Sequence, residues 1–427
     1  MKTYELNKIS KNELKNIFTR PSVTNDDVIE IVRPIVNDVK NKGLKAALSY
    51  AKKFDSFSGE SLIVTKKEFN SAEKKLDKKI KNALITAAEN IEKFHSKQFP
   101  KSYEVETIKG IKCRREFRAI ENVGLYIPGG TAVLPSTMLM LSIPAKIAGC
   151  KRVIAVTPAS ESIHPAVLFS AKINNVNEML KIGGAQGIAL LAYGDPEFNK
   201  VDKIFGPGNK YVTAAKTLVS IDPEGCTIDM PAGPSELLII ADENARAEFI
   251  AADILSQAEH GTDSQIILIS TSGYLAKEVE LEIAKQLMKL DRRKYALGAL
   301  ENSSIIIAQN INEAIMLSNT YAPEHLILNI NSAEKYINQI QNAGSVFLGK
   351  YSAESIGDYA SGTNHSLPTY GYARSISGVT VEAFMKSVSF QKVSQGGLNR
   401  IAETVMDLAE TEKLDAHANA VKIRIKK

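Results

Sequence analysis

Short apolar segments that end in glycine-rich turns and lead into helical patterns recur along the chain, and this feature restricts the fold more than any other. The first set of strand-like segments comprises residues 123–127, 151–158, 178–182 and 201–205. Three of them run into glycine turns, at residues 129–130, 183–187 and 206–208. Strands that alternate with helices at this spacing build a parallel sheet with helices on its faces. The sequence therefore predicts an α/β fold.

A second round of the same pattern follows in the C-terminal half. Its strand-like segments are residues 236–242, 264–270, 304–308, 327–330 and 345–348. A chain of 427 residues is also longer than one hydrophobic core usually supports. We therefore expect two Rossmann-like (incomplete) α/β domains with parallel sheets. Helical patterns near both ends of the chain predict helical N- and C-terminal extensions.

The composition is that of a globular protein, with 44% apolar and 24% charged residues. A formal net charge of +5 is small for this length and gives no reason to expect a nucleic-acid partner. No apolar run approaches the roughly 20 residues that span a bilayer, and the N-terminus lacks the apolar stretch of a secretory signal. The three cysteines form no CxxC pair, which favours a reducing compartment. We therefore expect a cytoplasmic protein with no membrane partner.

Four of the six histidines lie in short polar motifs of the second half, at positions 260, 325, 365 and 417. Histidine supplies metal-binding nitrogen and proton transfer near neutral pH. Gln257 and His260 share one face of a helix predicted over 245–260 and suit two ligands of one metal. Asp253 and Glu259 are competing donors, and spacing does not choose among them. The alternative is a surface helix end at which His260 interacts with the helix dipole.

Two further motifs place acidic groups near histidine. Glu324-His325 precedes a predicted strand and suits a proton-transfer pair, provided that the chain twists there so that both side chains reach one substrate. Two solvated residues ahead of a strand are the alternative. Residues 351–372 form a polar, glycine-rich stretch that contains Asp358 and His365 and is typical of a functional loop. Asp358 is suited to bind zinc through oxygen, alongside imidazole nitrogen.

The glycine turns end strands, which is where open α/β sheets bind ligands. None of them matches the G-x-G-x-x-G dinucleotide motif, and in the turn at 206–208 Tyr211 stands at the position of the third glycine. The turns are thus compatible with nucleotide binding without establishing it. Ser235 ends another rigid turn just before a strand, but no histidine lies near it in sequence. It is therefore not predicted to be a nucleophile.

Taken together, the ordered motifs resemble the histidinol dehydrogenase family over nearly the whole chain, from FTRP at residues 18–21 to TEKLDAH at residues 411–417. The densest motifs are VGLYIPGG, KIFGPGN, IDMPAGPSE, LSQAEHGTDSQ, YAPEHL and GDYASGTNHSLPTYG. The family oxidises L-histidinol through an aldehyde to L-histidine in two NAD-dependent steps, the last step of histidine biosynthesis. The resemblance implies the same substrate and the same need for zinc and NAD in this chain.

By motif, the resemblance assigns one zinc ion per subunit to Gln257, His260 and Asp358, with His417 as the remaining ligand. His417 is expected to come from the partner subunit of a homodimer, which makes the active site shared and the dimer necessary for activity. Zinc would bind the amine and imidazole nitrogens of the substrate, so that its main task is orientation.

The resemblance also implies roles for the other site residues. His325 would accept the alcohol proton, and Glu324 would activate water onto the aldehyde. The substrate contacts would be Ser235, Gln257, His260, His325, Asp358, Glu412 and His417, with His365 nearby. The NAD contacts would be Tyr126, Gln186 and Asn209, each on a glycine-turn segment.

The implied domain division is discontinuous. Residues 1–21 would form an N-terminal helical extension, and residues 379–427 a C-terminal helical segment that crosses to the partner subunit. Residues 22–119 and 235–378 would form a first α/β domain with the zinc and substrate site. Residues 120–234 would form a second α/β domain with the NAD contacts.

Three rival functions remain to be compared with this one. A related enzyme would use zinc and NAD on another small alcohol. A zinc hydrolase would use Glu324 to activate water without NAD, but it gives no purpose to the first set of glycine turns. A non-catalytic nucleotide-binding protein would have no use for four histidines in polar motifs.

Overall fold

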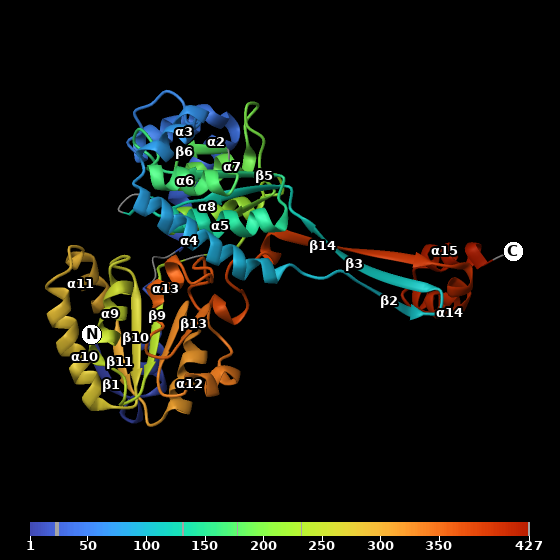
Figure 1. Cartoon of the computed structure of the whole chain (residues 1–427). Helices are drawn as coiled ribbons and strands as arrows, with labels where there is room; N and C mark the ends of the chain where they lie inside the picture. Colours follow the sequence, from blue (N-terminus) through green and yellow to red (C-terminus); the bar gives the residue numbers. More distant parts are fainter. Residues whose placement is uncertain (22–24, 130–131, 177, 232, 426–427) are drawn as a thin grey trace.

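Two parallel β-sheets, each covered by helices, form two lobes, and a long antiparallel arm projects from them (Figure 1). The computed structural model describes residues 1–21, 25–129, 132–176, 178–231 and 233–425. Gly130, part of the first predicted glycine turn, lies outside the described residues. The two parallel sheets confirm the predicted α/β class.

The five-stranded lobe is built on the strand order β6-β5-β4-β7-β8, and all its neighbouring strands are parallel. Leu125 and Ala155, on two adjacent strands, are fully buried, as expected for a sheet covered on both faces. Its strands are β4 (Asn122–Tyr126), β5 (Arg152–Thr157), β6 (Glu178–Lys181), β7 (Lys203–Phe205) and β8 (Thr227–Ile228). Its helices are α2 (Asn25–Phe54), α3 (Lys66–Lys75), α4 (Lys78–His95), α5 (Pro135–Ala148), α6 (Pro165–Ile173), α7 (Gly184–Tyr193) and α8 (Lys210–Ile221).

The six-stranded lobe has the strand order β1-β11-β10-β9-β12-β13, again with parallel neighbours. Its central strands are continuous apolar runs, since all six residues of β9 and of β10 are buried. Its strands are β1 (Lys2–Glu5), β9 (Glu236–Ala241), β10 (Gln265–Ser270), β11 (Ser304–Ile307), β12 (His325–Asn329) and β13 (Ser345–Leu348). Its helices are α1 (Lys11–Ile17), α9 (Ala247–Ala258), α10 (Gly273–Leu287), α11 (Arg293–Glu301), α12 (Ile311–Tyr321) and α13 (Glu354–Tyr359).

The arm is an antiparallel sheet of order β14-β3-β2 that carries two helices at its far end (Figure 1). Its elements are β2 (Tyr103–Ile108), β3 (Ile111–Ala119), β14 (Met385–Val393), α14 (Gln395–Thr411) and α15 (Asp415–Ile425). Large apolar side chains stand exposed along it, among them Val105, Phe390 and Leu408. Exposed apolar surface of this extent is typical of a protein–protein contact.

The structure differs from the predicted domain division at three places. Residues 2–5 form β1, an edge strand of the six-stranded sheet, so residues 1–21 are not a purely helical extension. Helix α2 packs on α7 and α8 and therefore belongs to the five-stranded lobe, although residues 22–119 were assigned to the other domain. Residues 379–427 contain the strand β14 as well as two helices.

Among the residues that the structure describes, none of the helices combines the length and the apolar character needed to cross a membrane. All three cysteines, Cys113, Cys150 and Cys226, carry free thiols.

Candidate active site

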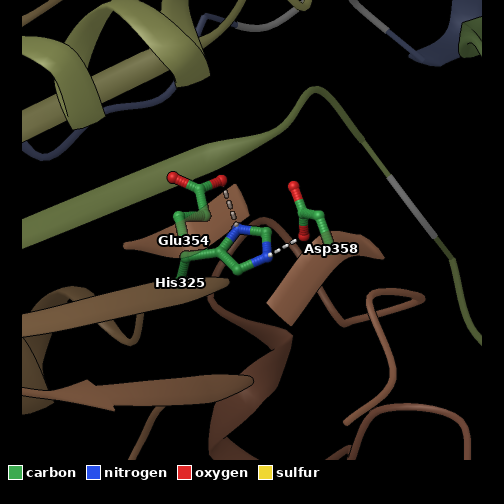
Figure 2. Close-up of side chains that lie close together, drawn as sticks. All are labelled: His325, Glu354 and Asp358. Atoms are coloured by element: carbon green, nitrogen blue, oxygen red, sulfur yellow. Dashed lines mark ion pairs between the residues drawn. The ribbon is translucent and has the colours of Figure 1, made fainter. Parts of the chain in front are cut away.

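His325 lies between two carboxylates at the amino end of β12 (Figure 2). Its Nδ1 is 3.3 Å from Oε1 of Glu354, and its Nε2 is 3.5 Å from Oδ1 of Asp358. Both acidic residues lie on the short helix α13, four positions apart, so that they project from the same face of that helix. The imidazole ring is thereby held between them at both nitrogen atoms.

Glu324 is buried beside the same ring, with its Oε2 3.7 Å from Nδ1 of His325. This oxygen accepts a hydrogen bond of 2.8 Å from the backbone N–H of Glu236, the first residue of β9. Because Glu324 precedes β12 and His325 begins it, the two adjacent side chains escape the strand alternation and line one cavity. The structure therefore brings the predicted pair together, and neither residue is solvated ahead of a strand.

The electrostatics of this cluster favour positive charge. Burial raises the pKa of Glu324 to about 8. Burial alone would lower the pKa of His325, but the neighbouring charges of Glu354, Glu324 and Asp358 outweigh it and raise that pKa to about 10. Burial also raises the pKa of Glu354 well above its usual value. Three carboxyl groups around one imidazole make the site suited to a cation.

The buried amide group of Gln257 is the strongest indication that this cavity binds a metal ion. Its side chain, on the last turn of α9, is completely buried, and within the described residues neither its Oε1 nor its Nε2 has a hydrogen-bond partner. Leaving a buried polar group unpaired costs about 1–3 kcal/mol. A metal ion bound to the amide oxygen would relieve part of this cost, so the residue fits the predicted zinc site.

Gln257, His260 and Asp358 line one cavity of about 490 Å³ together with Glu324 and His325. Three of the four predicted zinc ligands thus converge, from α9, from the turn that follows it and from α13. A tighter group of donor atoms, all within 4.8 Å of one another, is formed by His325, Glu354 and Asp358. This group shares Asp358 with the predicted set, so both sets place the cation in the same acidic region.

The cavity opens onto the five-stranded lobe, where it meets a second cavity of about 900 Å³. Tyr126 and Asn209 line both cavities, and Gln186 lines only the larger one. The larger cavity lies at the carboxyl ends of β4, β5 and β6, where parallel sheets bind ligands. The three predicted NAD residues therefore line one continuous space that reaches the candidate catalytic pair.

The glycine turns hold these residues in place. The backbone N–H of Gly184 donates to the hydroxyl of Tyr126 at 3.1 Å, and burial raises the pKa of that hydroxyl to about 12. Gly206 has φ +123°, and a Cβ atom there would lie 2.2 Å from the carbonyl oxygen of Tyr126. Only glycine allows the turn to approach β4 this closely. Asn209 follows and caps α8 through its Oδ1.

Other predicted residues divide into two groups. Ser235 lines the smaller cavity, and so does His365, whose Nδ1 lies 2.8 Å from the backbone oxygen of Asp358. Glu412 and His417 are exposed near the far end of the arm, outside the cavity of their own chain. One protomer therefore contains the predicted site without these two side chains.

Sequence reasoning missed a buried ion pair that contacts the candidate catalytic pair. Arg20 Nε and Nη2 donate to the two carboxylate oxygens of Glu236 at 2.6 and 2.9 Å. The backbone N–H of Glu236 bonds to Glu324, and its carbonyl oxygen lies 3.3 Å from Nδ1 of His325. The pair thus fixes the start of β9 against both residues. Its partners are 216 positions apart, which no local pattern can reveal.

The fold and the site together define an enzyme of two α/β lobes. A ligand space along the carboxyl ends of one sheet leads to an acidic, histidine-containing cavity at the amino ends of the other. Comparison with known proteins supports this class of enzyme and identifies the family. The family model described as histidinol dehydrogenase matches residues 18–425. The chain belongs to the histidinol dehydrogenase family of oxidoreductases.

Individual relatives match the chain over almost its full length. A histidinol dehydrogenase of Bacteroides thetaiotaomicron is 48% identical over 97% of this chain and 97% of its own. The chloroplastic histidinol dehydrogenase of Arabidopsis thaliana is 47% identical over 100% of this chain and 92% of its own. The crystal structure of histidinol dehydrogenase from Elizabethkingia anophelis superposes with a TM-score of 0.95 at 46% identity, covering 100% of this chain and 98% of that one.

Proposed function

We propose that this protein oxidises L-histidinol, through L-histidinaldehyde, to L-histidine with the reduction of two NAD, as the last step of histidine biosynthesis in the cytoplasm. One observation carries the proposal: within the described part of the chain, an unpaired buried amide, a group of acidic side chains and a Glu-His pair line one cavity that continues along the glycine turns. Membership of the histidinol dehydrogenase family supports the substrate. The free thiols support the reducing location.

Zinc would be held by Gln257, His260 and Asp358, with His417 of the partner subunit as the fourth protein ligand. When bound, zinc supplies orientation of the amine and imidazole nitrogens of the substrate, and some polarisation of its reacting oxygen. The donor set of one amide oxygen, imidazole nitrogen and one carboxylate suits this ion. The unpaired amide of Gln257 is the structural support.

His325 would take the alcohol proton in the first oxidation. A base must be neutral, whereas the surrounding carboxylates raise the pKa of His325 to about 10. Positive charge near Asp358 would reduce this influence and lower that pKa toward neutrality. Glu354 would then orient the ring by accepting a hydrogen bond from Nδ1, and Nε2, on the side of Asp358, would carry the lone pair that takes the alcohol proton.

Glu324 would act in the second oxidation by taking a proton from the water that adds to the aldehyde. Its pKa of about 8 allows proton exchange near neutral pH. The hydrogen bond from Glu236 N–H holds the carboxylate, so that the base is oriented before the substrate arrives. Tyr126, Gln186 and Asn209 would hold NAD, which supplies the hydride acceptor when it is bound.

The homodimer is part of the same proposal. The exposed apolar side chains of the arm need a covering surface, and Glu412 and His417 lie near the end of that arm. If two copies exchange arms, each cavity receives both side chains from its partner. The site then becomes complete only in the dimer.

The proposed function is tested by incubating the purified, zinc-loaded protein with NAD and limiting L-histidinol. We expect roughly two NADH, followed at 340 nm, for each L-histidinol consumed, since alcohol-to-acid oxidation removes four electrons. L-Histidine should be the product by mass spectrometry. NADH formation with another small alcohol but none with L-histidinol would overturn the substrate. Ester hydrolysis without NAD would instead support a zinc hydrolase.

Replacing Gln257 by methionine should remove zinc without unfolding the protein. Methionine has a similar shape and no amide to leave unpaired, so the variant should melt at or above the temperature of the zinc-free wild type. Bound zinc, measured by inductively coupled plasma mass spectrometry, should fall well below one ion per protomer. Gln286→Met on the outer helix α10 is the matched control. Full zinc content in Gln257→Met would remove Gln257 from the ligand set.

A further inference from the structure

The larger cavity contains a charge imbalance that the proposed chemistry does not explain. Asp55 is the only acidic residue among the described residues that line it, and none of those residues is lysine or arginine. A dinucleotide carries two phosphate charges, which a site without cations must hold through backbone N–H groups and neutral side chains. Any further phosphate on the ligand would meet this carboxylate, and the described lining residues offer no lysine or arginine to compensate for it.

Asp55 is held firmly at the start of α7. Its Oδ2 accepts hydrogen bonds from the backbone N–H of Gly183 at 2.9 Å and from Nε2 of Gln186 at 3.3 Å. Both bonds end on Oδ2, so within the described residues Oδ1 is available to a hydroxyl group of a ligand. The carboxylate also occupies the helix N-terminus that would otherwise attract a phosphate.

The position of Asp55 indicates which half of the coenzyme it meets. In the proposed reaction, the hydroxyl group of the substrate gives its proton to His325, and hydride leaves the carbon that carries this hydroxyl group. The nicotinamide ring must contact that carbon, so it lies in the smaller cavity. Tyr126 and Asn209 lie where the two cavities join, whereas Asp55 lines only the larger one. The adenosine half of the coenzyme therefore lies in the larger cavity, which Asp55 lines.

We propose that Asp55 selects NAD against NADP, by accepting a hydrogen bond from the 2′-hydroxyl of the adenosine ribose and repelling the 2′-phosphate. The inference rests on the proposed use of NAD. Two interactions combine in this selectivity. The carboxylate accepts a hydrogen bond from NAD, and it repels the negatively charged 2′-phosphate of NADP. Sequence reasoning had no signal for it, because Asp55 precedes the glycine turn by 128 positions.

The first test uses the wild-type protein and needs no turnover. ADP-ribose and 2′-phospho-ADP-ribose are titrated separately by calorimetry. We expect ADP-ribose to bind at least about 100-fold more tightly, the size of a discrimination built on a buried polar group. Equal binding of the two ligands would overturn the inference whatever any variant does. Failure of both ligands to bind would count against the proposed function itself.

The second test compares Asp55→Asn and Asp55→Ser with the wild type for binding of NADH and NADPH, followed by nicotinamide fluorescence, and for kcat/KM with NAD and NADP. Both variants should reduce the preference for NAD by about 10-fold or more, and binding of NADPH should improve in absolute terms. Asp222→Asn, in the same lobe but paired with Lys40 outside the cavity, should leave the preference unchanged. Equal loss of both coenzymes would show a structural role only and overturn the selectivity. If the wild type reduces NAD but the preference stays constant in both variants, only this inference fails.

Discussion

Replacing His325 by asparagine is expected to lower kcat for L-histidinol by about 10²- to 10⁴-fold, the usual contribution of a positioned general base. Asparagine keeps a polar group of similar size between Glu354 and Asp358 but cannot take the alcohol proton. Zinc content and melting temperature should remain close to those of the wild type. Stopped-flow measurement of the first NADH formed isolates the affected step.

The control is Gln286→Asn, an amide change on the outer helix α10, where the residue lines neither cavity. Its kcat should equal that of the wild type. A His325→Asn enzyme that retains more than a tenth of the wild-type kcat would show that another group accepts the proton. Loss of zinc from this variant would place His325 among the metal ligands, as its proximity to Asp358 and Glu354 permits.

Two inactive variants are expected to restore activity when they are paired in one dimer. His325→Asn damages the body of a protomer, and His417→Asn damages its arm. In a heterodimer of the two, one cavity carries both changes and the other carries neither, so about half of the wild-type activity should return. Co-expression with two different affinity tags and sequential purification yields the heterodimer for assay.

A second pairing shows whether the recovery arises from exchanged arms. His325→Asn combined with Asp358→Asn should stay inactive, because both changes lie in the body and neither cavity escapes damage. Recovery in this control would point to exchange of subunits with contaminating wild-type protein. A His325→Asn and His417→Asn heterodimer as inactive as its parents would remove the shared site from the proposal.

Most strands of the two lobes could be predicted because their information is local. The run at 236–242 and the one at 264–270 became β9 and β10 almost residue for residue. The arm could not be predicted this way, since every residue of β2 except the last is exposed and shows no buried face. An apolar stripe on α2 likewise predicts a helix with one buried face, but it does not tell which sheet will cover that face.

The site shows the same division between local and distant information. Spacing alone left Asp253, Gln257 and Glu259 as equal candidates, and the structure separates them because only Gln257 lines the cavity. Glu354 belongs to the polar stretch that the sequence predicts to be a functional loop. Its position beside His325 nevertheless depends on β12, a strand that ends 25 positions before Glu354. The roles of Arg20 and Asp55 could not be predicted, because each residue binds a partner more than a hundred positions away.

The edge position of β1 has a consequence for the order in which the molecule is completed during synthesis. Residues 2–5 leave the ribosome long before their partners, since they pair with residues 304–307, and Arg20 needs Glu236 and the backbone of Tyr321. The five-stranded lobe, which ends near residue 228, can be assembled while these first residues are still waiting. This segment is thus among the last to take its native position, although it is made long before its partners.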